Sequence, residues 1–174
     1  MSKIRISGII EESIVDGPGL RYTVFTQGCP HHCPGCHNPQ THDFNGGKLK
    51  DVSEIADSIA ENPLLSGVTI SGGEPFVQPK EVLELIKEIK KRANLGIMIY
   101  SGYTFEELAE MENPCVMEIL KLADILTDGR FIEKEKDYEL AYRGSRNQRV
   151  IDLKKTLAEN KVILYDLSSI SCYN

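Results

Sequence analysis

Three of the chain's five cysteines lie within eight positions, at Cys29, Cys33 and Cys36. Thiolates with the spacing C-x3-C-x2-C can hold an iron–sulfur cluster, and three of them leave one iron of a four-iron cluster free to bind a small molecule. Zinc is the alternative, and it would need a fourth protein ligand. Four nearby histidines offer that ligand: His31, His32, His37 and His42. The spacing favours the iron–sulfur cluster, and zinc binding remains the alternative.

A second segment that could bind a ligand is Gly72-Gly73-Glu74-Pro75, which follows a stretch with the pattern of a buried strand. Glycines at a strand end allow the backbone to approach a ligand closely, because they carry no side chain. The Glu74 carboxylate can accept hydrogen bonds from an ammonium group. The alternative interpretation is a tight turn between a strand and a helix that carries an exposed acid.

Two arginine-containing segments and two further cysteines have less specific patterns. In "VDGPGLR" (15–21), turn residues precede Arg21, which can pair with a carboxylate near a cluster. The segment "RGSRNQR" (143–149) is either a solvated charged loop or a positively charged edge that binds a carboxylate or a ribose. We expect Cys115 to be a core thiol and Cys172 to be a free thiol in the tail.

Apolar patterns predict strands that alternate with helices along the chain. Strands are expected at 21–27, 67–71, 96–100, 124–128, 148–152 and 161–166. Helices are expected at 51–62, 78–92, 104–111 and 115–123, and a surface turn at 45–50. This order indicates an α/β protein with a parallel sheet of five or six strands, either open or an incomplete barrel. Glycine-rich or cysteine-rich loops follow the first four strands, so the site is expected at the carboxyl ends of the strands.

The composition is that of an ordinary globular domain, with 41% hydrophobic and 26% charged residues in 174. This length fits a single domain over 1–174 that can bury a core. The net charge of −6 does not favour a nucleic-acid partner. No apolar run has the length of a signal peptide or a membrane span. We therefore expect a cytoplasmic protein without a membrane partner, whose clustered cysteines favour metal binding or catalysis over disulfides.

Taken in order, these segments resemble the radical S-adenosylmethionine enzymes. The resemblance rests on the three-cysteine motif after the first strand and on "GGEP" (72–75) after the second. With "VDGPGLR" and "GCPHHCPGCHNP" (28–39) they are similar to the glycyl-radical-enzyme activases. Three later segments narrow the resemblance to activases of anaerobic ribonucleoside-triphosphate reductase: "YSGYTFEEL" (100–108), "DILTDGRFIEKEKD" (124–137) and "YRGSRNQRVID" (142–152). The similarity extends over residues 4 to 165.

The resemblance implies an incomplete parallel (β/α) barrel of the radical S-adenosylmethionine type with one 4Fe–4S cluster. In this family S-adenosylmethionine binds the open iron through its amino and carboxylate groups. The reduced cluster passes one electron to the sulfonium, and the carbon–sulfur bond breaks to give methionine and a 5′-deoxyadenosyl radical. That radical takes a hydrogen atom from a glycine of the partner enzyme, so no side chain is expected to act as a catalytic acid or base.

The resemblance also implies two protein partners. One is the large subunit of anaerobic ribonucleoside-triphosphate reductase, whose carboxyl-terminal region bears the glycine. The other is an electron donor such as flavodoxin. The alternatives are an activase of another glycyl-radical enzyme, such as a formate-lyase-type enzyme, and a non-catalytic zinc-binding module.

Roles follow from the resemblance by position. The three clustered cysteines correspond to the iron ligands. The methionyl amino group corresponds to Gly73 and its two neighbours, Gly72 and Glu74. Positions near the bound nucleoside correspond to Gly35 and His37, on either side of Cys36.

The chain departs from the family pattern at one position and matches it loosely at two others. Many members have an aromatic residue just before the third cysteine, where this chain has Gly35, so contact with adenine there is expected from the backbone alone. Asn147 and Arg149 match their family segment only loosely. No second cysteine cluster follows Cys36, which argues against activases that carry additional ferredoxin-like clusters.

Overall fold

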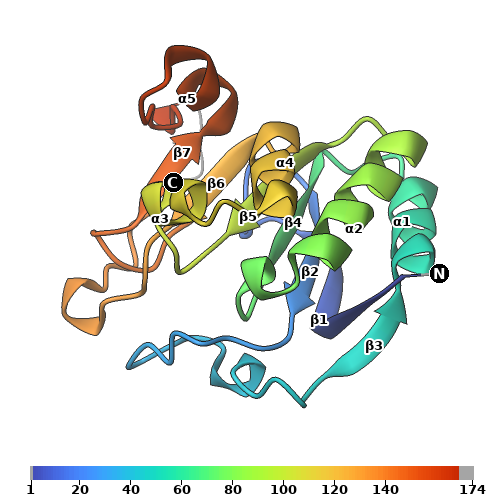
Figure 1. Ribbon diagram of the computed structural model, residues 1–174, viewed down its shortest axis with the longest axis horizontal. Helices are drawn as coiled ribbons and strands as arrows, with labels where there is room; N and C mark the ends of the chain where they lie inside the picture. Colours follow the sequence, from blue (N-terminus) through green and yellow to red (C-terminus); the bar gives the residue numbers. More distant parts are fainter. Residues whose placement is uncertain (1, 169–174) are drawn as a thin grey trace.

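A seven-stranded sheet with the order β3-β1-β2-β4-β5-β6-β7 runs through the protein (Figure 1). The computed structural model describes residues 2–168. Its strands are β1 (Lys3–Ser13), β2 (Arg21–Thr26), β3 (Lys48–Asp51), β4 (Gly67–Gly72), β5 (Gly96–Tyr100), β6 (Ile125–Asp128) and β7 (Arg149–Asp152). The four central strands, β2, β4, β5 and β6, are parallel, whereas β1, β3 and β7 pair antiparallel with their neighbours. The fold is therefore mixed α/β.

Three helices lie side by side on one face of this sheet: α1 (Val52–Glu61), α2 (Pro79–Arg92) and α4 (Pro114–Leu122) (Figure 1). Each turns an apolar stripe towards the strands. In α2 this stripe consists of Val82, Leu85, Ile86 and Ile89, all of which are buried. The shorter helices α3 (Phe105–Glu110) and α5 (Leu153–Glu159) follow β5 and β7. Within residues 2–168, no helix is long and apolar enough to cross a membrane.

Side-chain caps explain where two of the helices begin. The Asp51 side chain accepts a hydrogen bond from the backbone N–H of Ser53 at the start of α1. At the start of α3, Thr104 and Glu107 form a reciprocal capping box, as their spacing in the sequence predicts. All four predicted helices are confirmed within one residue at each end.

Five of the six predicted strands are confirmed, and the sixth, at 161–166, is wrong. This segment makes a single bridge to β7, between Leu164 and Ile151. Two backbone hydrogen bonds flank the bridge, from Tyr165 to Val150 and from Asp152 to Ile163. These contacts do not extend into a ladder, so the apolar run does not become a strand.

The predicted count of five or six strands, all parallel, is also wrong, because β1 and β3 were not predicted. In β1 the buried Ile4 and Ile6 alternate with partly exposed neighbours, but a register shift at Gly8 interrupts the pattern. The edge strand β3 has only four residues, "KLKD", in the region expected to be a surface turn. Short, charged edge strands carry little apolar signal in the sequence.

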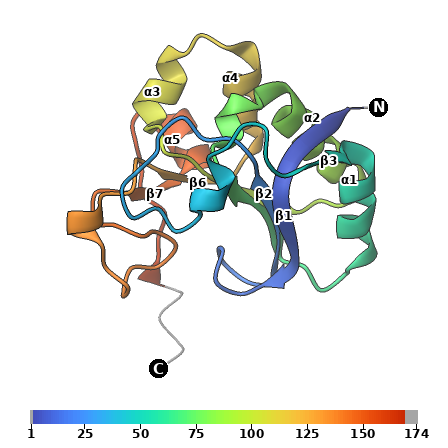
Figure 2. The ribbon, with the colours of Figure 1, turned by 90° about the horizontal axis from the view of Figure 1, so that it is seen from below.

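Parallel strands bring the loops at their carboxyl ends to one edge of the sheet. The cysteine loop follows β2, the glycine pair follows β4, and the turns at 101–104 and 129–131 follow β5 and β6. Figure 2 shows the cysteine loop beside the charged loop that connects β6 to β7. These loops therefore meet at the edge of the sheet where the sequence places the site.

Arg21 lies at the opposite end of the sheet, where β2 begins. Its side chain donates hydrogen bonds to the Thr69 hydroxyl and to three backbone carbonyls, those of Pro18, Val68 and Gly96. Burial lowers the pKa of the Arg21 guanidinium. The prediction that Arg21 pairs with a carboxylate near the cluster is therefore wrong, and this guanidinium instead ties the starts of three strands together.

Replacing Arg21 should destabilise the fold because it leaves buried carbonyls without donors. We expect Arg21→Met to lower the free energy of unfolding by about 2–4 kcal/mol, since hydrogen bonds to charged groups contribute roughly 1.5–3 kcal/mol each. Arg146→Met is the control, because its side chain is 60% exposed beside Asp137 and should cost less than about 1 kcal/mol. Urea denaturation of the metal-free chain measures both, and equal losses would contradict the structural role of Arg21.

Candidate cofactor site

A cavity of about 360 Å³ lies at the carboxyl ends of the four parallel strands. Cys29, Cys33 and Cys36 all line it. The loops after the other parallel strands contribute the opposite walls, through Ser71, Gly72, Gly73, Tyr100, Ser101, Gly102, Gly129 and Phe131. The structure thus brings the two segments that could bind a cofactor, the cysteine motif and the glycine pair, to the same cavity.

The three thiols are free. Cys29 is buried, whereas Cys33 and Cys36 are partly exposed. Burial raises the pKa of the Cys29 thiol, and backbone hydrogen bonds from His31 and His32 oppose that rise. The backbone N–H of Asn38 donates to Cys36 Sγ at 3.4 Å. Such N–H···S hydrogen bonds are among the means by which proteins set the potential of an iron–sulfur cluster.

The glycine pair after β4 packs directly against the cysteine loop. The backbone N–H of Gly73 donates to Thr26 O at 2.9 Å, and that of Glu74 donates to Gly28 O at 2.8 Å. A Cβ atom at Gly73 would overlap the carbonyl of Gly28. Gly73 must therefore lack a side chain so that the strand end and the cysteine loop can lie in contact, in addition to any contact with a ligand.

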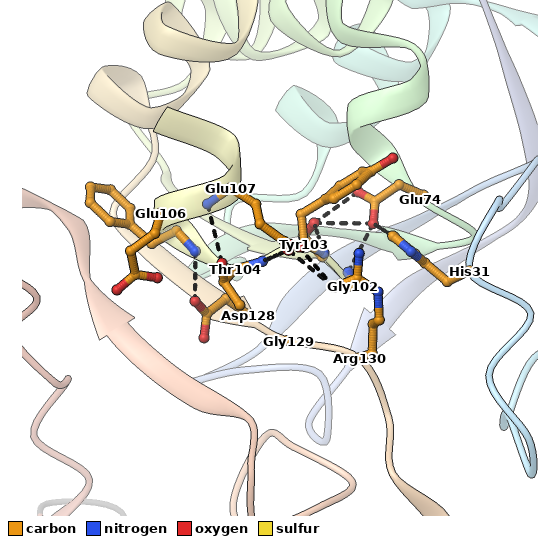
Figure 3. Close-up of polar contacts among 12 residues, drawn as sticks. His31, Glu74, Gly102, Tyr103, Thr104, Glu106, Glu107, Asp128, Gly129 and Arg130 are labelled. Atoms are coloured by element: carbon orange, nitrogen blue, oxygen red, sulfur yellow. Dashed lines mark hydrogen bonds and ion pairs between the residues drawn. The ribbon is translucent and has the colours of Figure 1, made fainter. Parts of the chain in front are cut away.

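Glu74 connects three of the loops through one buried carboxylate (Figure 3). It accepts hydrogen bonds from His31 Nε2 at 2.7 Å and from the Gly102 N–H at 2.8 Å. It also accepts from the Ser101 hydroxyl and from the Phe76 N–H. The carboxylate is fully buried and does not line the cavity. The expected contact between Glu74 and the methionyl group remains a prediction, whereas the contacts seen here hold the loops in place.

The residues beside the third cysteine differ in their relation to the cavity. His37 lines it, and its ring lies 5.1 Å from that of Phe131. Gly35 has a φ of +73° and does not line the cavity; a Cβ there would lie 2.9 Å from the Glu133 side chain. The left-handed conformation explains why this position favours glycine.

Asn147 and Arg149 hold the protein's own loops. Arg149 donates to Asp128 at 2.6 Å and to Glu106 at 2.7 Å, and these carboxylates raise the pKa of the Arg149 guanidinium. The Asn147 side chain donates to Arg130 O. Neither residue lines the cavity, so the structure gives no sign that either contacts a ligand there. Cys115 is partly buried in α4, far along the chain from the motif, and Cys172 lies outside the described residues.

Two residues that the sequence analysis did not single out for the cofactor also line the cavity. Among the buried side-chain nitrogen and oxygen atoms of residues 2–168, two lack a hydrogen-bond partner: His42 Nε2 and Arg143 Nε. Both residues line this cavity, and among the described residues Arg143 is the one lysine or arginine that does so. Buried polar atoms in folded proteins usually have partners. Two unpaired atoms in one cavity therefore indicate that it takes a polar ligand.

The sequence contained a partial signal for these residues. Arg143 belongs to the segment "RGSRNQR", whose pattern allowed either a solvated charged loop or a positively charged edge that binds a carboxylate or a ribose. The path of this loop decides which arginine faces the cavity: Gln148 accepts from the N–H groups of Gly144 and Ser145 and so curls the segment. The pattern of apolar residues in the sequence does not predict such a turn.

Comparisons with known proteins assign the chain to a family. A family model described as a 4Fe-4S single cluster domain matches residues 15–151. The anaerobic ribonucleoside-triphosphate reductase-activating protein of Escherichia coli (strain K12) is 35% identical over 152 residues, which cover 81% of this chain and 94% of that protein. The chain belongs to this family of activating proteins. The relatives of the same name from enterobacteria phage T4 and Vibrio cholerae are 33% and 32% identical, over 78% of this chain and 86% and 89% of theirs.

Among solved structures, QueE from Escherichia coli is similar over 59% of this chain and 53% of its own, with 18% identity and a TM-score of 0.47. That score is too low to support a shared fold. Family membership therefore rests on the sequence relatives and on the cluster-domain model.

The side chains of the cavity fit the cluster that the family model describes. Three free thiols on one loop are the donor set of such a cluster, and N–H groups lie next to two of the sulfurs. Among residues 2–168, no three His, Cys, Asp or Glu side chains are close enough together to hold a single metal ion. The cavity therefore offers three thiols as cluster ligands and two unpaired nitrogen atoms as hydrogen-bonding groups.

A side chain at Gly73 should disturb the cysteine loop itself. We expect Gly73→Ala to lower the free energy of unfolding by about 1–3 kcal/mol through overpacking, and to reduce iron uptake during anaerobic reconstitution. Gly8→Ala is the control, because a Cβ there would meet no heavy atom within 4 Å. Iron content per chain and thermal unfolding measure both effects. A Gly73→Ala protein that takes up iron as well as Gly8→Ala does would contradict this packing argument.

Proposed function

We propose that this chain activates anaerobic ribonucleoside-triphosphate reductase by generating a glycyl radical on it. It is a radical S-adenosylmethionine enzyme in this proposal, and its sheet is the incomplete barrel of that class. Cys29, Cys33 and Cys36 hold one 4Fe–4S cluster. The cavity beside them holds S-adenosylmethionine.

One observation carries the proposal: three free thiols from a single loop line a cavity that also contains two unpaired buried nitrogen atoms. Three thiolates leave a position on a four-iron cluster for a ligand that is not protein. The unpaired Arg143 Nε–H calls for a hydrogen-bond acceptor, and the unpaired His42 Nε2 calls for a polar partner. A small molecule with a carboxylate satisfies both requirements. The named relatives supply the identity of the reaction's partner.

When bound, the cluster and S-adenosylmethionine supply a one-electron reduction that breaks the carbon–sulfur bond and yields methionine and a 5′-deoxyadenosyl radical. The chain's own residues bind and orient. Arg143 is the cation of the cavity and would take the carboxylate of the cofactor. The backbone at Gly72 and Gly73 lines the wall where the methionyl group would lie, and Cys36 and His37 line the cavity as proposed neighbours of the nucleoside. Gly35 stays a proposed neighbour by its position beside Cys36. Cavity walls that exclude water would protect a reactive radical.

The alternative functions have less support. The matched family model describes a 4Fe-4S domain, which favours a cluster over a zinc-binding module. The named relatives from bacteria and a phage share the same partner enzyme in their names, which favours the reductase over a formate-lyase-type enzyme. The glycine-bearing carboxyl-terminal region of the large subunit and a flavodoxin-like electron donor remain the proposed contacts of the chain.

The ligand assignment predicts a sharp difference among the cysteines. Single changes of Cys29, Cys33 or Cys36 to Ser should remove most of the iron after anaerobic reconstitution, because hydroxyls are poor ligands for such clusters. Cys115→Ser is the control and should keep the wild-type iron content, since this residue lies on α4. Iron and sulfide analysis with visible absorbance measures the difference. Full iron content and activity in a Cys36→Ser protein would refute the assignment.

The proposed reaction is tested with the reduced, reconstituted chain, S-adenosylmethionine and the large reductase subunit in the absence of oxygen. Paramagnetic resonance should detect a glycyl radical on the reductase, and 5′-deoxyadenosine should form in step with it. Deuterium in the target glycine should appear in the deoxyadenosine, because the radical takes that atom. Formation of deoxyadenosine without a reductase radical, while a formate-lyase-type partner is activated, would replace this function with the alternative one.

A further inference from the structure

His31 lies in the cysteine loop between the first two thiols, and its ring is clamped from two sides. Nε2 donates to the Glu74 carboxylate at 2.7 Å, and the side chain is 6% exposed. The Tyr103 ring packs edge-on against the imidazole, with ring centroids 4.5 Å apart at an interplanar angle of 74°. Figure 3 shows the imidazole of His31 facing the Glu74 carboxylate.

Both sides of the clamp belong to rigid parts of the fold. Glu74 follows β4 and also accepts from Ser101 and Gly102, which follow β5. Tyr103 lies between β5 and the capping box of α3, and the guanidinium of Arg130 lies over its ring at 5.7 Å. The ring of His31 also fits closely against Gly102, where a Cβ would overlap it. The contacts therefore attach the loop to the ends of β4 and β5 at one residue.

We propose that His31 is a positioning residue that sets the placement of the Cys29 and Cys33 thiolates relative to the rest of the cofactor cavity. It does so by anchoring the intervening loop to Glu74 and Tyr103. The inference rests on the proposed function, because it assigns the anchored thiolates to the cluster. Groups that hold metal ligands in orientation typically change metal affinity or activity by about 10- to 100-fold when they are removed.

The rival role for His31 is that of an additional ligand, which would have to use Nδ1 because Nε2 donates to Glu74. His31 Nε2 is already engaged by Glu74, whose Oε2 also accepts from the Gly102 N–H and so acts as an acceptor. His31 lies two residues from Cys29 and two from Cys33 and lines the same cavity as both thiols, so movement of this residue moves the loop that carries them. His32 is the matched control, because it is the next residue in the loop but its exposed ring packs on His42 instead.

The test compares His31→Gln and His31→Asn with His32→Gln and His32→Asn in the full-length chain. A glutamine amide reaches the position of the imidazole Nε2 and can still donate to Glu74, whereas the shorter asparagine amide cannot. After anaerobic reconstitution, we measure iron content, the midpoint potential of the cluster and the paramagnetic resonance spectrum of its reduced form. We then titrate the spectral change with S-adenosylmethionine.

We expect His31→Asn to keep most of its iron, to show a shifted potential and a heterogeneous spectrum, and to need about 10-fold more S-adenosylmethionine for the spectral change. His31→Gln and both His32 variants should behave like the wild type. Thermal unfolding of the metal-free chains identifies any variant that does not fold. If His31→Asn is one of these, Tyr103→Leu takes its place, because it removes the other contact of the His31 ring and should shift the same three readouts.

Two results would overturn the inference. In one, His31→Asn matches the His32 variants in potential, spectrum and response to S-adenosylmethionine. In the other, His31→Gln and His31→Asn both lose iron to the level of Cys33→Ser, which would make His31 a ligand. A wild-type chain that takes up no cluster would instead overturn the proposed function, and the inference with it.

Discussion

The buried carboxylate of Glu74 is the contact on which the arrangement of the site depends. A carboxylate removed from water is costly unless hydrogen bonds replace its hydration. Here the donors come from the cysteine loop, from the segment after β4 and from the turn after β5, through His31, Phe76, Ser101 and Gly102. None of these segments can move alone without leaving a donor or the acid unsatisfied. One acid therefore fixes the relative position of loops that are far apart in the sequence.

The sheet explains why those loops meet at all. Only the four central strands are parallel, and the loops that follow them line the cavity together with Val15 and Asp16, which follow β1. Parallel strands with apolar runs are buried on both faces, and helices α1, α2 and α4 cover one face of this sheet. The antiparallel strands β1, β3 and β7 extend the sheet beyond the parallel core. The buried Arg21 holds the opposite ends of the parallel strands.

The order of strands and special loops could be predicted from the sequence because each loop follows an apolar run directly. The position of the cavity, its three thiols and its glycine wall followed from that order. The partners of Glu74 could not be predicted, since His31 and Gly102 are separated from it by 43 and 28 positions. Nothing in the local pattern distinguishes an acid at a turn that faces solvent from one buried against a histidine.

The same limit applies to the arginine-rich segment and to the edges of the sheet. Arg143 lines the cavity whereas Arg149 bonds to Asp128 and Glu106, although the two arginines are only six positions apart. A curled loop, held by Gln148, decides between them. The strands β1 and β3 were missed because a register shift and shortness weaken their alternation. Partners distant in the sequence and irregular backbone thus account for most of what sequence patterns did not predict.

The central claim is that the three thiolates leave one iron open and that S-adenosylmethionine binds it in this cavity. Electron–nuclear double resonance of the reduced, reconstituted chain tests that claim most directly, with the cofactor labelled by nitrogen-15 in its amino group and by oxygen-17 in its carboxylate. The account predicts hyperfine couplings to both labels that are large enough to require direct bonds to iron. Couplings of purely through-space size, in a chain that still cleaves the cofactor, would contradict it.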